Sequence, residues 1–173
     1  MEKTKYIGIY YGDESGFTET PYVPYGWQVK GENLSIPTQK GRRWNVFGIM
    51  DKFGNLFADK TLKSIDSEFV INCINSFSNN PAREPRSIII LDNAKIHHSN
   101  QFQANIDRWK KEGIEIFYLP TYSPELNLIE ILWKKIKYEW FVPKDYESWG
   151  KITDKLNDII TNFGVKYKIN FKF

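Results

Sequence analysis

The feature that most constrains the fold is a short run of aliphatic residues in the middle of the chain. Residues 87–91 read Ser-Ile-Ile-Ile-Leu, and they are bounded by Pro85 and Asp92. A strand without polar alternation is typical of the middle of a parallel sheet, where both faces are covered. The sequence therefore predicts an α/β fold with helices on both faces of a sheet.

Strand and helix patterns alternate on either side of this run. We predict further strands at 6–12, 44–50, 55–60 and 114–119, and helices at 67–77, 99–111, 123–140 and 148–163. A leading strand, a hairpin and then alternating units favour a mixed sheet. This order is compatible with several α/β architectures, the ribonuclease H-like one among them.

Composition excludes several classes of protein. The 173-residue chain is 41% hydrophobic and 26% charged, which excludes a disordered or coiled-coil protein. Its longest aliphatic run, residues 88–91, is too short to span a bilayer, so we expect no membrane partner. The single cysteine, Cys73, lies in an apolar helical pattern and is predicted to be a buried hydrophobic residue. We expect the tryptophans at 27, 44, 109 and 133 in the core.

Charge is distributed unevenly along the chain. From residue 131 onward there are nine lysines and five acidic residues, whereas the whole chain has a net charge of +3. A basic C-terminal third suits a polyanion such as nucleic acid, although it is also typical of a solvated helix face. Lys134, Lys135 and Lys137 are the predicted contacts to a nucleic-acid backbone.

Two carboxylates follow the most convincing strands. Asp13 comes after residues 6–12, and Asp92 comes after residues 88–91. Ligands of open α/β sheets collect beyond the carboxyl ends of the strands. Two neighbouring carboxylates there would favour a hard cation such as Mg²⁺ or Mn²⁺. The alternative is that each acid caps the turn that follows its strand.

A third candidate, Glu130, lies on the predicted helix that Ser123 and Pro124 open. Glu130 is one position off the apolar stripe of this helix, so it can point toward the strand ends. Two local explanations are equally open. Asn127 and Glu130 have the spacing of a capping box, and Glu130 with Lys134 has the spacing of an i,i+4 ion pair.

Three segments together carry a family resemblance. They are Tyr-Gly-Asp-Glu-Ser-Gly-Phe at 11–17, Ile-Leu-Asp-Asn-Ala-Lys-Ile-His-His-Ser at 90–99, and the segment 117–137. The third is the most specific, because Pro-Thr-Tyr-Ser-Pro-Glu-Leu-Asn runs into Ile-Glu and Trp. In this order they resemble the catalytic domain of mariner-type insertion-sequence transposases, which are DDE superfamily endonucleases. The resemblance implies a ribonuclease H-like mixed sheet flanked by helices on both faces.

The resemblance also implies a metal-bound acidic triad of Asp13, Asp92 and Glu130. With two Mg²⁺ or Mn²⁺ ions, such a triad performs DNA strand cleavage and strand transfer in transposition. The implied partners are the transposon ends and target DNA, and we predict that His97 contacts a phosphate. Residues 1–164 would form the catalytic domain, followed by a tail at 165–173 that is either an edge strand or a basic arm.

Two departures from the family pattern bear on function. Leu128 stands where the family has a proline, and the first predicted strand begins near Met1, without an N-terminal helix-turn-helix. We therefore expect a homodimer or a complex with a separate helix-turn-helix half, in the cytoplasm at a prokaryotic nucleoid. The alternative is an inactive or domesticated remnant that acts as a nucleic-acid-binding protein. Adjacent histidines such as His97 and His98 are poorly placed to bind one zinc ion.

Overall fold

Five strands form one mixed sheet at the centre of the protein. The computed structural model describes residues 6–21, 41–121 and 123–171. The sheet order is β3-β2-β1-β4-β5, with β1 paired antiparallel to β2 and parallel to β4. The strands are β1 (Ile7–Thr18), β2 (Arg43–Asp51), β3 (Leu56–Thr61), β4 (Arg86–Leu91) and β5 (Ile114–Tyr118). The predicted mixed sheet is confirmed.

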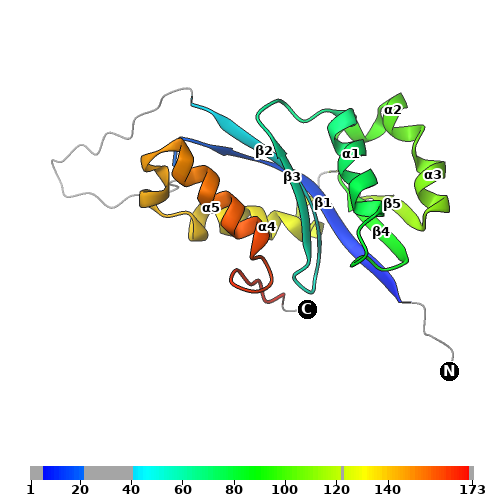
Figure 1. Ribbon diagram of the computed structural model, residues 1–173. Helices are drawn as coiled ribbons and strands as arrows, with labels where there is room; N and C mark the ends of the chain where they lie inside the picture. The colour runs from blue at the N-terminus through cyan, green and yellow to red at the C-terminus, as the bar shows by residue number, and fades with distance from the viewer. Residues whose placement is uncertain (1–5, 22–40, 122, 172–173) are drawn as a thin grey trace.

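Helices cover both faces of this sheet. They are α1 (Ser67–Ser78), α2 (Asn100–Gln103), α3 (Ile106–Lys111), α4 (Ile129–Lys135) and α5 (Trp149–Thr161). The first three lie on one side of the sheet, and α4 and α5 lie on the other (Figure 1). Within the described ranges, no helix has the length and apolar character needed to cross a bilayer.

Polar caps begin the two longest helices close to where the sequence predicts. Asp66 caps α1, because its Oδ1 accepts a hydrogen bond from the Phe69 N–H at 2.9 Å. Ser148 caps α5 in the same way, with its hydroxyl oxygen 3.2 Å from the Lys151 nitrogen. Such caps satisfy amide groups that have no partner within the helix.

The predicted helix over 99–111 is interrupted. It consists of α2 and α3, separated by Ala104 and Asn105, and a 3-10 turn at Lys95–His98 precedes it. The Asn105 side chain donates to the Gln101 carbonyl at 2.9 Å. Asparagine side chains that bond to the nearby backbone compete with helix continuation, which accounts for the break.

The predicted helix over 123–140 begins later and ends differently. A 3-10 turn at Pro124–Leu126 precedes α4, and a π-helical turn at Ile136–Trp140 follows it. Ser123 does not cap a helix, because its hydroxyl lies 3.5 Å from the Thr121 carbonyl oxygen as a donor. The start of α4 is instead set by a contact to β1, which is described with the site below.

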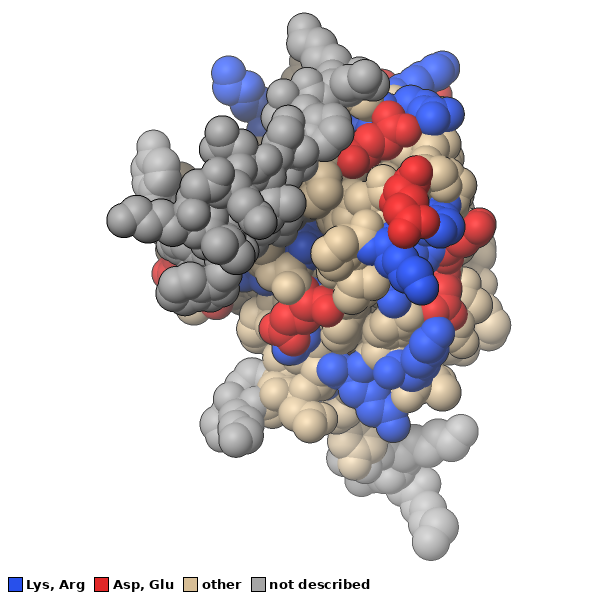
Figure 2. Space-filling model, turned by 90° about the vertical axis from the view of Figure 1, so that its left-hand side faces the viewer, with Lys and Arg blue, Asp and Glu red and all other residues tan. Residues whose placement is uncertain are grey.

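The basic C-terminal third does not form one continuous positive surface. On the α5 end of the molecule, basic and acidic side chains are interspersed (Figure 2). Lys151 forms an ion pair with Glu147, and Lys166 forms one with Asp158. Local acidic partners therefore offset part of the charge asymmetry that the sequence shows.

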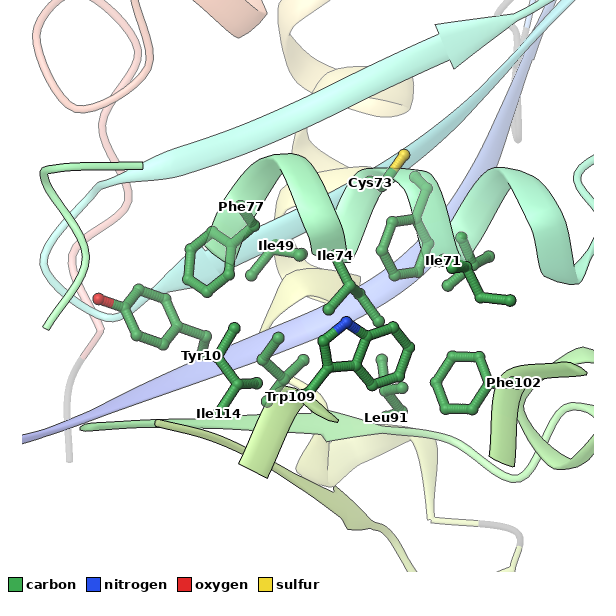
Figure 3. Packing of buried hydrophobic residues seen from close by; sticks show 13 residues of the cluster. Tyr10, Ile49, Ile71, Cys73, Ile74, Phe77, Leu91, Phe102, Trp109 and Ile114 are labelled. Atoms are coloured by element: carbon green, nitrogen blue, oxygen red, sulfur yellow. The ribbon is translucent and has the colours of Figure 1, made fainter. Parts of the chain in front are cut away.

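The first core cluster lies between the sheet and α1, α2 and α3 (Figure 3). Trp109 has no exposed surface there, and its ring meets Phe102 edge-on with centroids 5.0 Å apart. Cys73 is 2% exposed, and burial raises the pKa of its thiol to about 12. The prediction that Cys73 is a buried hydrophobic residue is confirmed.

The second core cluster lies between the sheet and α4 and α5, and it includes Trp133. Trp44 is only half-buried and stacks on Trp149, whereas Trp27 lies outside the described residues. Tyr167 is buried in the same cluster, and its hydroxyl donates to Asp158 Oδ2 at 2.6 Å. Part of the predicted tail therefore packs on the domain, and the division at residue 164 stays a prediction.

One face of β4 is less covered than its sequence predicts. Ser87, Ile89 and Leu91 are buried, but Ile88 and Ile90 on the other face are half-buried. The reason is the position of α4 and α5, which pack against β1, β2 and β3. The prediction of a strand buried on both faces is therefore wrong for this second face.

Trp109 offers a test of the first core cluster. We expect Trp109→Ala to lower the free energy of unfolding by about 3–5 kcal/mol, because it leaves a cavity and removes a buried ring. Urea denaturation measures this loss. The control is Phe53→Ala, since Phe53 is 80% exposed, and its effect should stay within about 0.5 kcal/mol. Equal effects of the two substitutions would contradict the packing.

Candidate active site

Asp13 and Asp92 stand side by side at the edge of the β1–β4 pairing. The last paired rung joins Tyr11 to Ile90, and each aspartate follows its rung by two residues. The prediction that the first strand ends at Gly12 is wrong, because β1 continues to Thr18 in pairing with β2. Asp13 therefore lies within a strand, at the point where that strand loses its β4 neighbour.

Glu130 is brought to Asp13 by the close approach of α4 to the sheet. Asp13 pairs across the β1–β2 ladder with Gly48. A Cβ atom at Gly48 would lie 2.9 Å from the Trp133 ring and 3.0 Å from Ile129. The helix α4 can therefore pack this close to β2 only because residue 48 has no side chain. Asp13 and Glu130 line the same cavity of about 510 Å³.

Asn127 fixes the start of α4 and was missed as a site residue by the sequence. Its buried side-chain amide donates to the Gly12 carbonyl at 3.0 Å, one residue before Asp13. Asn127 Oδ1 accepts no hydrogen bond, so the capping-box alternative, in which it would accept from the Glu130 N–H, is not realised. The i,i+4 ion pairs of the described residues do not include Glu130 with Lys134 either.

The electrostatics of Asp13 set it apart from an ordinary surface carboxylate. Burial, and after it the nearby charges of Glu14, Glu130 and Asp92, together raise the pKa of Asp13 to about 8. The same cavity is lined by Lys137, whose pKa is lowered chiefly by burial. The negative charge around Asp13 is therefore only partly compensated, and such a site attracts a cation.

The Asp92 carboxylate is turned toward His97. His97 Nδ1 lies 3.1 Å from Asp92 Oδ1, and this hydrogen bond is the main reason why the pKa of Asp92 is lowered. His97 has no exposed surface, so the structure does not offer it to a DNA phosphate as predicted. Burial acts to lower the pKa of His97, but Asp92 and Glu14 outweigh it and the pKa is raised.

The donor chemistry of the three carboxylates fits a hard divalent cation, but their arrangement does not yet enclose one. Asp13 and Glu130 face the cavity, whereas Asp92 is not among its lining residues. In the described ranges, no three His, Cys, Asp or Glu side chains are close enough to hold one metal ion. His98 does not join them, because its Nε2 lies 3.2 Å from Asn93 Oδ1. Carboxylate oxygens remain the ligands that Mg²⁺ prefers.

Of the three predicted DNA-binding lysines, only Lys137 lines the cavity. Lys135 is paired with Glu139 at 2.6 Å, and Lys134 is exposed on α4. The sequence missed Arg43, which also lines the cavity and lies over Gly16, where a Cβ atom would be 2.1 Å from the guanidinium. No sequence pattern marks Arg43, because its place depends on the register between β1 and β2.

Comparison with known proteins identifies the family. The model of the DDE superfamily endonucleases matches residues 8–150, and the chain belongs to this family. A curated relative, the insertion element IS630 uncharacterized 39 kDa protein of Shigella sonnei, is 24% identical over 131 residues. That match covers 74% of this chain and 37% of the relative, so the chain spans little more than a third of the relative's length.

Solved structures confirm the fold. The Mos1 transposase paired-end complex with left transposon end matches with a TM-score of 0.63 and 17% identity, over 88% of this chain and 47% of that one. The Mos1 mariner paired end complex with Mn matches with a TM-score of 0.60 and 16% identity, over 88% and 48%. The predicted ribonuclease H-like fold is therefore confirmed.

The raised pKa of Asp13 predicts an unusual pH dependence of stability. The folded chain binds a proton at Asp13 more tightly than the unfolded chain, in which the pKa of aspartate is about 4. Stability without divalent cations should therefore fall as the pH rises toward 8. We expect Asp13→Asn to raise the melting temperature at pH 8.5, by about 2–4 °C for each kcal/mol added to the free energy of unfolding. The increase should be smaller at pH 5.

The control for this experiment is Asp107→Asn, since Asp107 is an exposed residue on α3. Differential scanning calorimetry at both pH values measures the effect. A melting temperature of Asp13→Asn that stays at or below that of the unsubstituted protein at pH 8.5 would contradict the electrostatic picture.

Proposed function

We propose that this chain is the catalytic domain of a DNA transposase in which Asp13, Asp92 and Glu130 bind two Mg²⁺ or Mn²⁺ ions. One observation carries the proposal. Carboxylates from β1 and α4 face a single cavity, and burial together with their mutual repulsion raises the pKa of Asp13. Membership of the DDE superfamily endonucleases and similarity to an insertion-element protein support it.

Each side chain has a distinct role in the proposed reaction. The bound cations would activate water or a DNA 3′-hydroxyl and stabilise the leaving oxygen at a phosphodiester. Asp13, Asp92 and Glu130 would hold the ions through their carboxylate oxygens. Arg43 and Lys137 line the same cavity and would bind flanking phosphates.

The proposed partners are transposon ends and target DNA. Mos1 transposase has been solved in complex with a transposon end, and the similarity of this chain to that fold supports a DNA substrate here. We assign recognition of the element ends to a separate helix-turn-helix half or to a second copy in a homodimer. An insertion-element relative from a bacterium supports action at a prokaryotic nucleoid, in the cytoplasm.

Asp92→Asn and Glu130→Gln test the acidic triad, because each keeps the shape of the side chain and removes its charge. We expect each to reduce Mg²⁺-dependent nicking of a supercoiled plasmid by at least about 100-fold. The affinity for DNA, measured by fluorescence anisotropy, should stay unchanged. Glu139→Gln is the matched control on the same helical segment. Nicking by Asp92→Asn in Mg²⁺ would contradict the assignment. Metal-independent binding without nicking by the unsubstituted protein would favour the inactive remnant.

Arg43→Ala and Lys137→Ala test the phosphate contacts. Each lost contact should reduce the slope of log affinity against log salt concentration by about 0.9 on duplex DNA. Gly16→Ala should weaken binding in the same way, because a Cβ atom there displaces the guanidinium, and it should add nothing to Arg43→Ala. Lys110→Ala on α3 is the control, and an equal loss for this variant would contradict a specific role for the cavity.

A further inference from the structure

His97 is held rigidly inside the protein next to the site. Its ring lies between Phe47 and Phe102, with centroids 6.4 Å and 5.7 Å away. The backbone N–H of His97 donates to the Ala94 carbonyl at 3.0 Å, and the backbone carbonyl of His97 accepts from the Tyr118 hydroxyl at 2.9 Å. Both the backbone and the ring of His97 therefore have little freedom.

The two ring nitrogens of His97 face two acidic residues. Nδ1 lies 3.1 Å from Asp92 Oδ1 and 3.2 Å from the Asp92 carbonyl oxygen, so Nδ1 is the donor to both. Nε2 is buried and has no hydrogen-bond partner, and it lies 3.7 Å from Glu14 Oε1. Glu14 lies on β1 just past the part that pairs with β4, and Asp92 follows β4, so the ring links two strands where their pairing ends.

The two oxygens of the Asp92 carboxylate differ in their contacts, because the hydrogen bonds described for it go to Oδ1. Oδ1 also accepts the Ala94 N–H at 3.0 Å, so two donors converge on this atom. The side chain of Asp92 is 49% exposed and lies beyond the last residue of β4, where no strand pairing orients it. The two donors to Oδ1 therefore determine where Oδ2 points.

We propose that His97 is a positioning residue of the active site, which with Glu14 holds the Asp92 carboxylate so that Oδ2 alone is presented to a divalent cation. This inference rests on the proposed function. Packing between Phe47 and Phe102 does not by itself call for a histidine, because a phenylalanine would fill the same space without burying polar nitrogens. Carboxylates that bind metals are commonly oriented by such outer hydrogen bonds, and losing one weakens metal binding 10–100-fold.

Three variants separate positioning from packing. His97→Phe fills the space without a donor, His97→Asn keeps a donor near the place of Nδ1, and His98→Phe is the control at an exposed neighbour. The readouts are Mn²⁺ affinity by calorimetric titration of the metal-free protein, the Mg²⁺ concentration for half-maximal plasmid nicking, and the melting temperature. We expect His97→Phe to weaken both metal dependences about 10–100-fold, His97→Asn to retain most of them, and His98→Phe to match the unsubstituted protein.

The outcomes that overturn the inference are distinct from failure of the proposed function. Unchanged Mn²⁺ affinity in a folded His97→Phe variant overturns it, and so do equal losses in the Phe and Asn variants. If His97→Phe does not fold, His97→Leu, which also lacks a donor, decides: weaker Mn²⁺ binding at an unchanged melting temperature supports the inference, and unchanged binding overturns it. If the unsubstituted protein neither binds Mn²⁺ nor nicks DNA, the proposed function itself fails and the inference falls with it.

Discussion

The buried hydrogen bond from Asn127 to the Gly12 carbonyl determines where α4 begins and therefore where Glu130 lies. Because α4 has no side-chain cap of its own, this contact and the bare backbone at Gly48 are what seat the helix on β1 and β2. Leaving a buried donor or acceptor unpaired costs about 1–3 kcal/mol. The distance between two acidic side chains far apart in sequence is thus controlled by backbone contacts of the sheet.

The site combines opposite charges within one cavity. Asp13 and Glu130 stand near Arg43 and Lys137, and burial still raises the pKa of Asp13 while it lowers that of Lys137. Under the proposed function, this arrangement suits a substrate that itself brings both charges, a phosphate backbone with its cations.

Much of the fold could be predicted from local patterns. The caps at Asp66 and Ser148 and the aliphatic run before Asp92 each act over a few residues, so the sequence reveals them directly. The places of Arg43 and Asn127 could not be predicted, because they depend on strand register and on a contact between distant segments. The burial of the His97 ring could not be predicted either, because no sequence pattern shows which ring atoms the fold encloses.

The half-buried carboxyl of Asp13 has a consequence for the amount of protein in a cell. Under the proposed function, a cation that neutralises Asp13 would bind the folded chain in preference to the unfolded one and so shift the population toward the folded form. Proteases remove chains that unfold, and changes of about 1–2 kcal/mol alter abundance several-fold. The supply of divalent ions would then govern how long each molecule survives as well as how fast it works.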